Sequence, residues 1–320
     1  MNRPAQVESD TAPEGRAEVP ARPGPPALDR RGFLRALAVA GGAAVLAPRA
    51  ARPAPRGGTL RIGLAAPPAG ERTAAVESAV RGVTLGVEEA ARTGELFGRG
   101  VELRAADAAE ALAERDGVAA LVGGWDAASC RALAALAGSA GVLFLNAGCT
   151  ADALRGPACG RGTFHVESSD AMRRAALAGG APEGADATHA VLWHPSLERF
   201  GAAQLNQRFR ARFAAEMDGP AWAGWMAVKA LWEASLRARS TDPAALRAHL
   251  EREGTQLDGH KGWPLSFRAG DHQLRQPLYL VAGGGARVVG EVPARPADGP
   301  SSRELLDRLA GAPVPCAPTP

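Results

Sequence analysis

The sequence has little lysine, little tyrosine and no long apolar run. Lys229 and Lys261 are its two lysines, so arginine supplies nearly all of its 37 basic residues, against 34 acidic ones. The formal net charge of +3 over 320 residues gives no electrostatic case for a nucleic-acid-binding protein. No stretch of about eighteen consecutive apolar residues occurs, so we expect no membrane span in the mature chain.

Several motifs that carry chemistry are also missing. No predicted strand is followed by GxGxxG or GxxxxGKS/T, which disfavours dinucleotide-binding and P-loop proteins. GxSxG, CxxC and HxxxH do not occur, so the sequence predicts neither a serine hydrolase nor a zinc site. The composition, 46% hydrophobic and 22% charged, is that of a globular protein. We expect a protein that is not an enzyme and that uses no cofactor and no metal.

The first fifty residues have the pattern of an export signal. Arg30 and Arg31 precede Phe33 and Leu34, and the apolar stretch over 36–47 is too short to span a bilayer as a helix. This order is typical of a twin-arginine signal peptide; the alternative is a disordered tail with a chance arginine pair. We predict a twin-arginine signal over 1–50, a periplasmic protein, and a linker over 51–58.

Export brings the four cysteines into an oxidising compartment. Cys149 and Cys159 lie ten residues apart in a loop that contains glycine and proline, and they could close a small disulfide. Cys130 lies in a helical pattern and Cys316 in a Pro-rich tail. Four cysteines allow three pairings. The sequence therefore leaves Cys149–Cys159 as one candidate disulfide, with a buried or free thiol as the alternative.

Strand and helix patterns alternate over the first half of the mature chain. The predicted strands cover 59–65, 101–105, 118–122 and 141–145, and the predicted helices cover 73–91, 108–115 and 127–137. This βαβαβαβ order predicts an α/β fold, with a parallel sheet flanked by helices and right-handed crossovers. We assign this N-terminal lobe to 59–165.

The second half has fewer strand patterns. We predict a loop over 179–188, helices over 197–213, 221–239 and 243–253, and strands over 265–267, 277–281 and 288–289. We assign 166–292 to a shortened C-terminal lobe and the hinge crossings between the lobes. A Pro-rich tail with a short helix over 303–309 occupies 293–320.

Three segments resemble the leucine-type, type I periplasmic binding proteins of ABC importers. They are the strand–loop–helix order over 60–154, the helix over 219–229, and the segment 257–277 with its Gly-His-Lys-Gly-Trp-Pro run. The third segment resembles the subgroup encoded with pyrroloquinoline-quinone-dependent alcohol dehydrogenases. The resemblance implies a monomeric extracytoplasmic protein that holds a small organic solute between two lobes. Its protein partner would be an ABC permease or a periplasmic quinoprotein dehydrogenase.

One departure from that family concerns the second lobe. In the family several βα units separate the segments around Met172 and Trp193, whereas here only about twenty residues do. In leucine-type binders that region supplies the acidic group that grips the ligand's ammonium group, and this sequence has no counterpart. We therefore expect a shortened second lobe. The alternative function is that of a degenerate binding protein, acting as an accessory or interaction protein for a periplasmic dehydrogenase or sensor.

The family's loop positions imply a set of ligand-binding residues after two neighbouring strands. They are Trp125, Asp126, Ala127, Gly148 and Thr150. An indole beside free backbone N–H groups suits an apolar guest that carries one carboxylate or hydroxyl. The alternatives are that Trp125 packs between helix and sheet, Asp126 caps the next helix, and Thr150 stabilises its own loop.

A partner surface is a further candidate site. Trp222 and Trp225 fall in one aromatic stripe on the predicted helix over 221–239. Such a stripe is usually core, but part of it would be exposed where the second lobe lacks its sheet. His260 and His272 lie in the 257–277 segment, where the alternatives are a structural or hinge role, a contact with a partner or ligand, and catalysis. The sequence leaves these alternatives open for the four residues.

Overall fold

The computed structural model describes residues 58–106, 109–114, 117–156, 160–180, 187–295 and 301–311. The predicted signal peptide, almost all of the linker and half of the tail lie outside these residues. No helix among the described residues is long and apolar enough to cross a membrane.

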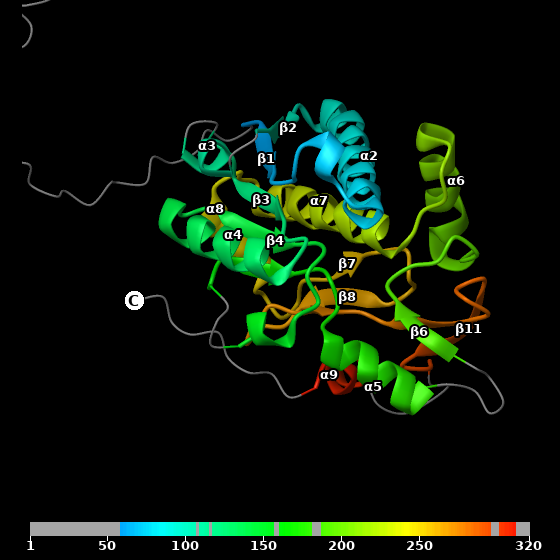
Figure 1. The fold of residues 1–320 in the computed structure, drawn as a ribbon. Coiled ribbons are helices and arrows are strands. Elements are labelled where there is room, and N and C mark those ends of the chain that lie inside the picture. The colour runs from blue at the N-terminus through cyan, green and yellow to red at the C-terminus, as the bar shows by residue number, and fades with distance from the viewer. Residues whose placement is uncertain are drawn as a thin grey trace, which may run out of the picture. The chain divides into compact units, whose positions relative to one another are not determined.

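A five-stranded parallel sheet forms the N-terminal lobe (Figure 1). Its strands are β1 (Leu60–Leu64), β2 (Val101–Ala105), β3 (Ala120–Gly123), β4 (Leu143–Asn146) and β5 (Thr163–His165). Their order is β2-β1-β3-β4-β5, and every neighbouring pair is parallel. Apolar side chains of β1, β3 and β4 are buried on both sides, because helices cover both faces of a parallel sheet. The predicted strands are confirmed. The fifth strand was missed because its three residues are too few to show a pattern.

The helices between these strands follow the predicted order. They are α2 (Ala74–Phe97), α3 (Ala109–Glu114) and α4 (Ala127–Ala140), with short 3₁₀ turns at η1 (Ala69–Glu71) and η2 (Asp152–Leu154). The α2 helix runs six residues beyond its predicted end at residue 91. It stops at Gly98, whose φ of 63° is the left-handed conformation that glycine tolerates best.

The helix α7 (Gly219–Ala238) lies side by side with α2, followed by α8 (Pro243–Leu250) (Figure 1). Their backbones approach closely at Gly82 of α2, where a Cβ atom would lie only 1.9 Å from the carbonyl oxygen of Ala221. The α7 helix also contacts β1 and β3. Part of 166–292, which we assigned to the second lobe and the hinge crossings, therefore packs against the N-terminal lobe.

The second lobe has a small sheet. It contains β6 (Ala187–Val191), β10 (Leu278–Ala282) and β11 (Arg287–Val292) in the order β11-β10-β6, with β10 antiparallel to both neighbours. Its helices are α5 (Asp170–Gly180), α6 (Ala202–Phe213) with the 3₁₀ turn η3 (Arg199–Gly201), and α9 (Ser302–Ala310). Within the described chain, β6 is the one strand between α5 and α6, as expected for a shortened lobe. The predicted loop over 179–188 is too long, because α5 and β6 occupy both of its ends.

The 257–277 segment connects the two lobes. It folds into a small antiparallel sheet of β7 (Leu257–Asp258), β8 (Pro264–Phe267) and β9 (Leu274–Arg275). The backbone N–H of His165, at the end of β5, donates to the carbonyl of His272 over 2.9 Å. The side chain of Gln273 also donates to the carbonyls of His165 and Glu167. Buried polar contacts therefore fix this segment against the edge of the five-stranded sheet.

Candidate functional site

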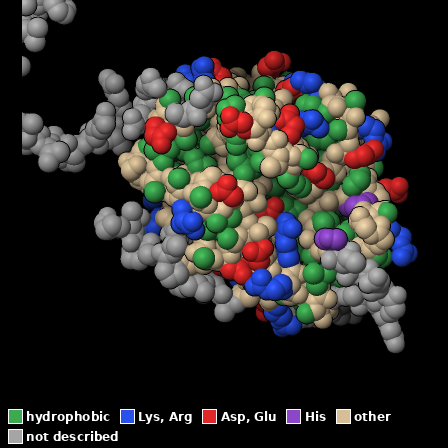
Figure 2. Space-filling view, in the orientation of Figure 1, with side chains coloured by type: hydrophobic (Ala, Val, Ile, Leu, Met, Phe, Trp, Pro, Cys, Tyr) green, Lys and Arg blue, Asp and Glu red, His purple; other side chains and the backbone are tan. Residues whose placement is uncertain are grey.

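A cavity of about 510 Å³ opens at the carboxyl ends of β1, β2 and β3. The loops after these strands and the first turns of α2 and α4 form its walls; we call it the N-lobe cavity. Its lining residues are Ala65, Ala66, Pro67, Glu71, Thr73, Val76, Ala106, Ala109, Trp125, Asp126, Ser129, Ala132 and Leu133. Hydrophobic side chains gather over β3 in the space-filling view, with acidic side chains beside them (Figure 2).

Trp125 forms one wall of this cavity. Its indole N–H donates to the carbonyl of Ala65 over 2.8 Å, which ties the loop after β3 to the loop after β1. Its ring also covers Gly148, where a Cβ atom would lie 2.8 Å from the ring carbon Cε3. Trp125 therefore both lines the cavity and packs in the loop layer, and its contact with a bound ligand stays a prediction.

Asp126 caps α4 as well as lining the cavity. Its Oδ1 accepts a hydrogen bond from the backbone N–H of Ser129 over 2.7 Å, and this bond is the main reason that the pKa of Asp126 is lowered. The hydroxyl oxygen of Ser129 in turn accepts from the backbone N–H groups of Trp125 and Asp126. The chain itself therefore uses the backbone N–H groups of Trp125, Asp126 and Ser129. The chain's own carboxylate occupies the helix N-terminus, where a ligand anion would bind.

The ionisable side chains in the described lining of the N-lobe cavity are both acidic. Among the described residues that line it, Glu71 and Asp126 are the ionisable ones, and none is Lys or Arg. The remaining lining is mostly alanine, proline, valine and leucine around one indole. Such a lining repels an anionic guest and admits an apolar guest that is uncharged or positively charged.

Gly148, Thr150 and Ala127 do not line the N-lobe cavity. Gly148 lies behind the Trp125 ring, and the carbonyl of Thr150 accepts from the backbone N–H of Asp170 over 2.8 Å. Ala127 is the first residue of α4. In this structure Gly148 and Thr150 make contacts between the loops around the cavity, and Ala127 packs against the apolar cluster beside α4. As contacts of a bound ligand they stay a prediction.

The residue that shapes the loop after β4 is Asn146, which is not among the predicted site residues. Its Oδ1 accepts from the backbone N–H groups of Gly148 and Cys149, and its Nδ2 donates to the carbonyl of Cys149 and to Nδ1 of His165. The side chain is fully buried. An amide directly after a buried strand and before a glycine was the signal that could have revealed it.

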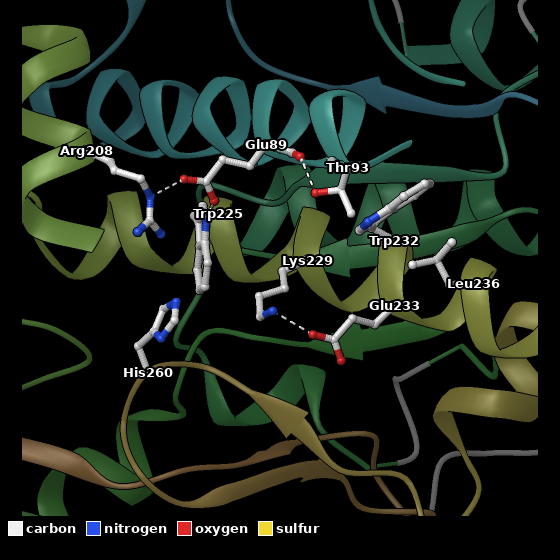
Figure 3. Close-up of a pocket in the computed structure, with 11 residues that line it drawn as sticks. Glu89, Thr93, Arg208, Trp225, Lys229, Trp232, Glu233, Leu236 and His260 are labelled. Carbon is white, nitrogen blue, oxygen red and sulfur yellow. Dashed lines mark hydrogen bonds and ion pairs between the residues drawn. The ribbon is translucent and has the colours of Figure 1, made fainter. Parts of the chain in front are cut away.

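A second cavity, of about 360 Å³, lies between α2, α6 and α7 (Figure 3). Its charged side chains pair with one another: Arg208 Nε lies 2.6 Å from Glu89, and Lys229 Nζ lies 2.6 Å from Glu233. The indole N–H of Trp225 donates to the same Glu89 carboxylate over 2.9 Å. Because these charged groups already neutralise one another, a solute would gain little from binding to them. The second cavity is therefore the weaker candidate site.

The predicted partner surface is wrong for three of its four residues. Trp222, Trp225 and His272 are all buried, because α2 and the 257–277 segment cover the aromatic stripe although the second lobe is small. The indole N–H of Trp222 donates to the carbonyl of Gly259, and Nδ1 of His272 lies 2.9 Å from the carbonyl of Thr163. His260 lines the second cavity and stacks on Trp225 with 5.4 Å between ring centroids.

The described cysteines are Cys130 and Cys149, and both are buried thiols. Both belong to one apolar cluster of buried side chains. Cys159 lies outside the described residues, so the Cys149–Cys159 disulfide stays a prediction. Within the part of the chain that the structure describes, no three His, Cys, Asp or Glu side chains are placed to hold a metal ion.

The sequence over 59–185 and 173–286 matches a family model described as periplasmic binding protein. The chain belongs to the periplasmic binding protein family. The family implies a periplasmic location. No curated protein matches the sequence.

Solved structures of other binding proteins share the fold of this periplasmic binding protein. An ABC-type branched-chain amino acid transporter protein from Rhodopseudomonas palustris is 17% identical, with a TM-score of 0.58 over 73% of this chain and 95% of that one. LivJ from Streptococcus pneumoniae in complex with isoleucine is 14% identical, with a TM-score of 0.59 over 73% and 98%. A solute-binding protein from Rhodopseudomonas palustris BisB5 in complex with 3,4-dihydroxybenzoic acid is 12% identical, with a TM-score of 0.56 over 69% and 92%. These similarities establish the α/β fold with a helix-flanked parallel sheet.

Proposed function

We propose that this periplasmic binding protein captures a small organic solute in the N-lobe cavity and delivers it to an ABC permease, without chemical turnover. The observation that carries the proposal is the position of the cavity at the carboxyl ends of β1, β2 and β3, where ligands of open α/β sheets bind. Export by the twin-arginine route remains part of the proposal, on the residue pattern over 30–47.

The solute that fits this cavity is largely apolar and carries a hydroxyl or an ammonium group. Asp126 already occupies the N-terminus of α4, and Glu71 adds a second acidic group to the lining. A carboxylate ligand would meet two like charges and find no basic side chain among the described lining residues. A site that binds the carboxylate group of its ligand would have the opposite charge preference.

The link to quinoprotein alcohol oxidation belongs to the same proposal. It rests on the resemblance of the 257–277 segment to the subgroup encoded with those dehydrogenases. An alcohol or an aldehyde is uncharged, so the lining of the N-lobe cavity suits either class of solute. A monomer is expected, because the proposed site is complete within one chain.

The test compares three ligands that share an aromatic ring and a two-carbon chain length but differ in the head group. They are 2-phenylethanol, 2-phenylethylamine and phenylacetate. A ligand that binds only the native state raises its stability, so thermal unfolding reports binding. We expect the alcohol and the amine at millimolar concentration to raise the Tm, and phenylacetate to leave it unchanged. Stabilisation by none of them, nor by short alcohols and aldehydes, would contradict the proposed site. Stabilisation chiefly by phenylacetate would contradict only the solute class.

The variant Asp126→Ser sharpens this comparison. Serine keeps an oxygen that can cap α4 but removes the negative charge, so we expect phenylacetate binding to strengthen by about tenfold, which is about 1.4 kcal/mol. Asp242→Ser is the matched control, because Asp242 caps α8 in the same way and does not line the N-lobe cavity. The control should lose similar stability and leave the order of the three ligands unchanged.

The reduced second lobe favours one alternative, an interaction protein derived from a binder. Its sheet has three strands among the described residues, so little of the family's second ligand-gripping surface is present. A stable complex with a purified quinoprotein alcohol dehydrogenase in size-exclusion chromatography, together with no response to any solute, would replace the transport proposal. Solute binding without such a complex would exclude the alternative.

A further inference from the structure

Lys261 is buried between the two lobes, with 1% of its surface exposed. Its Nζ donates to Oε1 of Gln276 over 2.9 Å and to the carbonyl of Pro277 over 3.1 Å. The same nitrogen lies 3.9 Å from the ring centroid of Trp222 and 5.5 Å from that of Tyr279. All four groups are electron-rich, so they suit an ammonium group, which donates three hydrogens and accepts none.

The groups around this amine come from both lobes. Trp222 lies in the first turn of α7, which packs against α2 in the N-terminal lobe. Tyr279 lies in β10 of the second-lobe sheet. The side chain of Gln276 also donates to the carbonyl of Val166, in the connection from β5 to α5, over 2.7 Å. The amine therefore contacts both lobes directly, and it reaches a connection between them through Gln276.

The turn that carries Lys261 is braced on both sides. The flanking residues His260 and Gly262 have φ angles of 57° and 68°. This left-handed conformation is uncommon outside glycine and persists where surrounding contacts determine it. Arg295 supplies such contacts, because its guanidinium group donates to the carbonyls of Lys261 and Gly262 over 2.5 and 2.6 Å. The backbone N–H of His260 also donates to Oδ1 of Asp258 over 2.8 Å.

Burial of this amine is costly. It lowers the pKa of Lys261 well below the usual range, against the charges of Glu167 and Glu291. Those two carboxylates have other partners: that of Glu167 lies 2.8 Å from Arg173, and that of Glu291 accepts from the indole N–H of Trp263. A methionine would fill nearly the same space without this cost. What the amine adds over such an apolar side chain is a set of directional contacts to both lobes.

We propose that Lys261 acts as an internal tether that fixes the second lobe against the N-terminal lobe when no solute is bound. Gln273 fixes the 257–277 segment to the edge of the five-stranded sheet. Lys261 fixes the same segment to the start of β10 through the carbonyl of Pro277. Because the N-lobe cavity is lined by the N-terminal lobe alone, the tether leaves it open.

Two ion pairs on the surface also link the lobes. Arg208 and Arg212 on α6 pair with Glu89 and Glu88 on α2. The two arginine side chains are 40% and 51% exposed, and exposed ion pairs contribute little stability and weaken with salt. High salt can therefore weaken these pairs while the buried tether stays intact.

The experiment measures the distance between the lobes by double electron–electron resonance on the full-length protein. No solute is added, so the outcome does not depend on the proposed function. Spin labels are attached through Ala135→Cys on α4 and Ala178→Cys on α5, two exposed positions, in a background of Cys159→Ser and Cys316→Ser. We expect one narrow distance in this labelled parent protein, at low salt and in about 1 M NaCl. Addition of Lys261→Met should give a broader distribution that contains a second distance.

The other lysine provides the matched control. Lys229 Nζ pairs over 2.6 Å with Glu233 on the same helix, so Lys229→Met should keep the narrow distance. If Lys261→Met does not fold, Gln276→Met tests the same tether, since it removes one acceptor of the amine and the hydrogen bond to Val166. We expect the second distance in this variant too.

Hydrogen exchange distinguishes a released lobe from a general loss of stability. The backbone N–H of His165, which donates to the carbonyl of His272, should exchange about tenfold faster in Lys261→Met, whereas the amides of β3 and β4 should keep the parent rates. Equal acceleration of all these amides would overturn the proposal. One narrow distance in the folded variants, or a second distance in the parent protein produced by salt alone, would also overturn it.

Discussion

The side chains of Asp126 and Asn146 show how single residues shape the candidate site. Each satisfies backbone N–H groups at the carboxyl end of a strand, Asp126 at the start of α4 and Asn146 in the turn after β4. Donors that are satisfied internally are not available to a ligand. The sequence predicts that both residues lie in loops after strands. Only the hydrogen bonds show that their side chains bind the backbone N–H groups of the same loops.

His165 makes the stability of the protein depend on pH. Complete burial, followed by the charges of Arg155 and His272, holds the pKa of His165 well below its ordinary value. The folded protein therefore keeps a neutral imidazole, whereas the unfolded chain takes up a proton below about pH 6.5. Because the unfolded state then binds more protons, the free energy of unfolding falls as the pH falls through that range.

The variant His165→Asn tests this dependence. The Oδ1 of asparagine can accept the hydrogen bond that Asn146 Nδ2 now donates to His165 Nδ1 over 3.0 Å, and it does not titrate. We expect the difference in urea midpoint between pH 7 and pH 5 to become smaller than in the wild type. It should not vanish, because burial also lowers the pKa of His249 and His272. His165→Leu should show the same smaller slope but lower stability at pH 7. An unchanged slope in His165→Asn would contradict this account.

At the scale of elements, local pattern predicted the N-terminal lobe better than the second lobe. Alternating strand and helix signals reveal β1 to β4 and their helices, because each element is long enough to show its period. β5 has three residues, and α5 and β6 flank an Ala/Gly-rich stretch without a pattern, so these elements were missed. The packing of α7 against α2 depends on contacts between segments far apart in the sequence. The spacing of apolar residues predicts each helix but not the helix that packs against it.

The contact between α2 and α7 gives a prediction about packing. In Gly82→Ala the new methyl group would fall 1.9 Å from the backbone oxygen of Ala221, so the two helices must separate. We expect the free energy of unfolding to fall by about 2–4 kcal/mol, measured by urea titration. Gly138→Ala in α4 is the control, because nothing lies within 4 Å of its Cβ position. The control should gain about 0.5–1 kcal/mol, as alanine favours a helix over glycine. Equal effects of the two substitutions would contradict the close packing.

At the scale of the whole molecule, the candidate site lies on one lobe. Of the five predicted ligand-binding residues, Trp125 and Asp126 line the N-lobe cavity, whereas Ala127, Gly148 and Thr150 do not. The family resemblance implied which loops form the site. It did not imply the negative charge of the lining, which depends partly on Glu71 in the loop after β1. The aromatic stripe proved to be core because distant segments cover it. Sequence spacing alone does not determine such coverage.

The central claim is that a solute binds beside Trp125, and the spectrum of fluorinated tryptophan tests it most directly. The chain has six tryptophans, so protein labelled with 5-fluorotryptophan should give six ¹⁹F signals, and Trp125→Phe identifies the one from Trp125. We expect titration with 2-phenylethanol to move the Trp125 signal to saturation and to leave those of Trp225 and Trp232, which line the second cavity, unchanged. An unmoved Trp125 signal, or movement confined to Trp225 and Trp232, would contradict the claim.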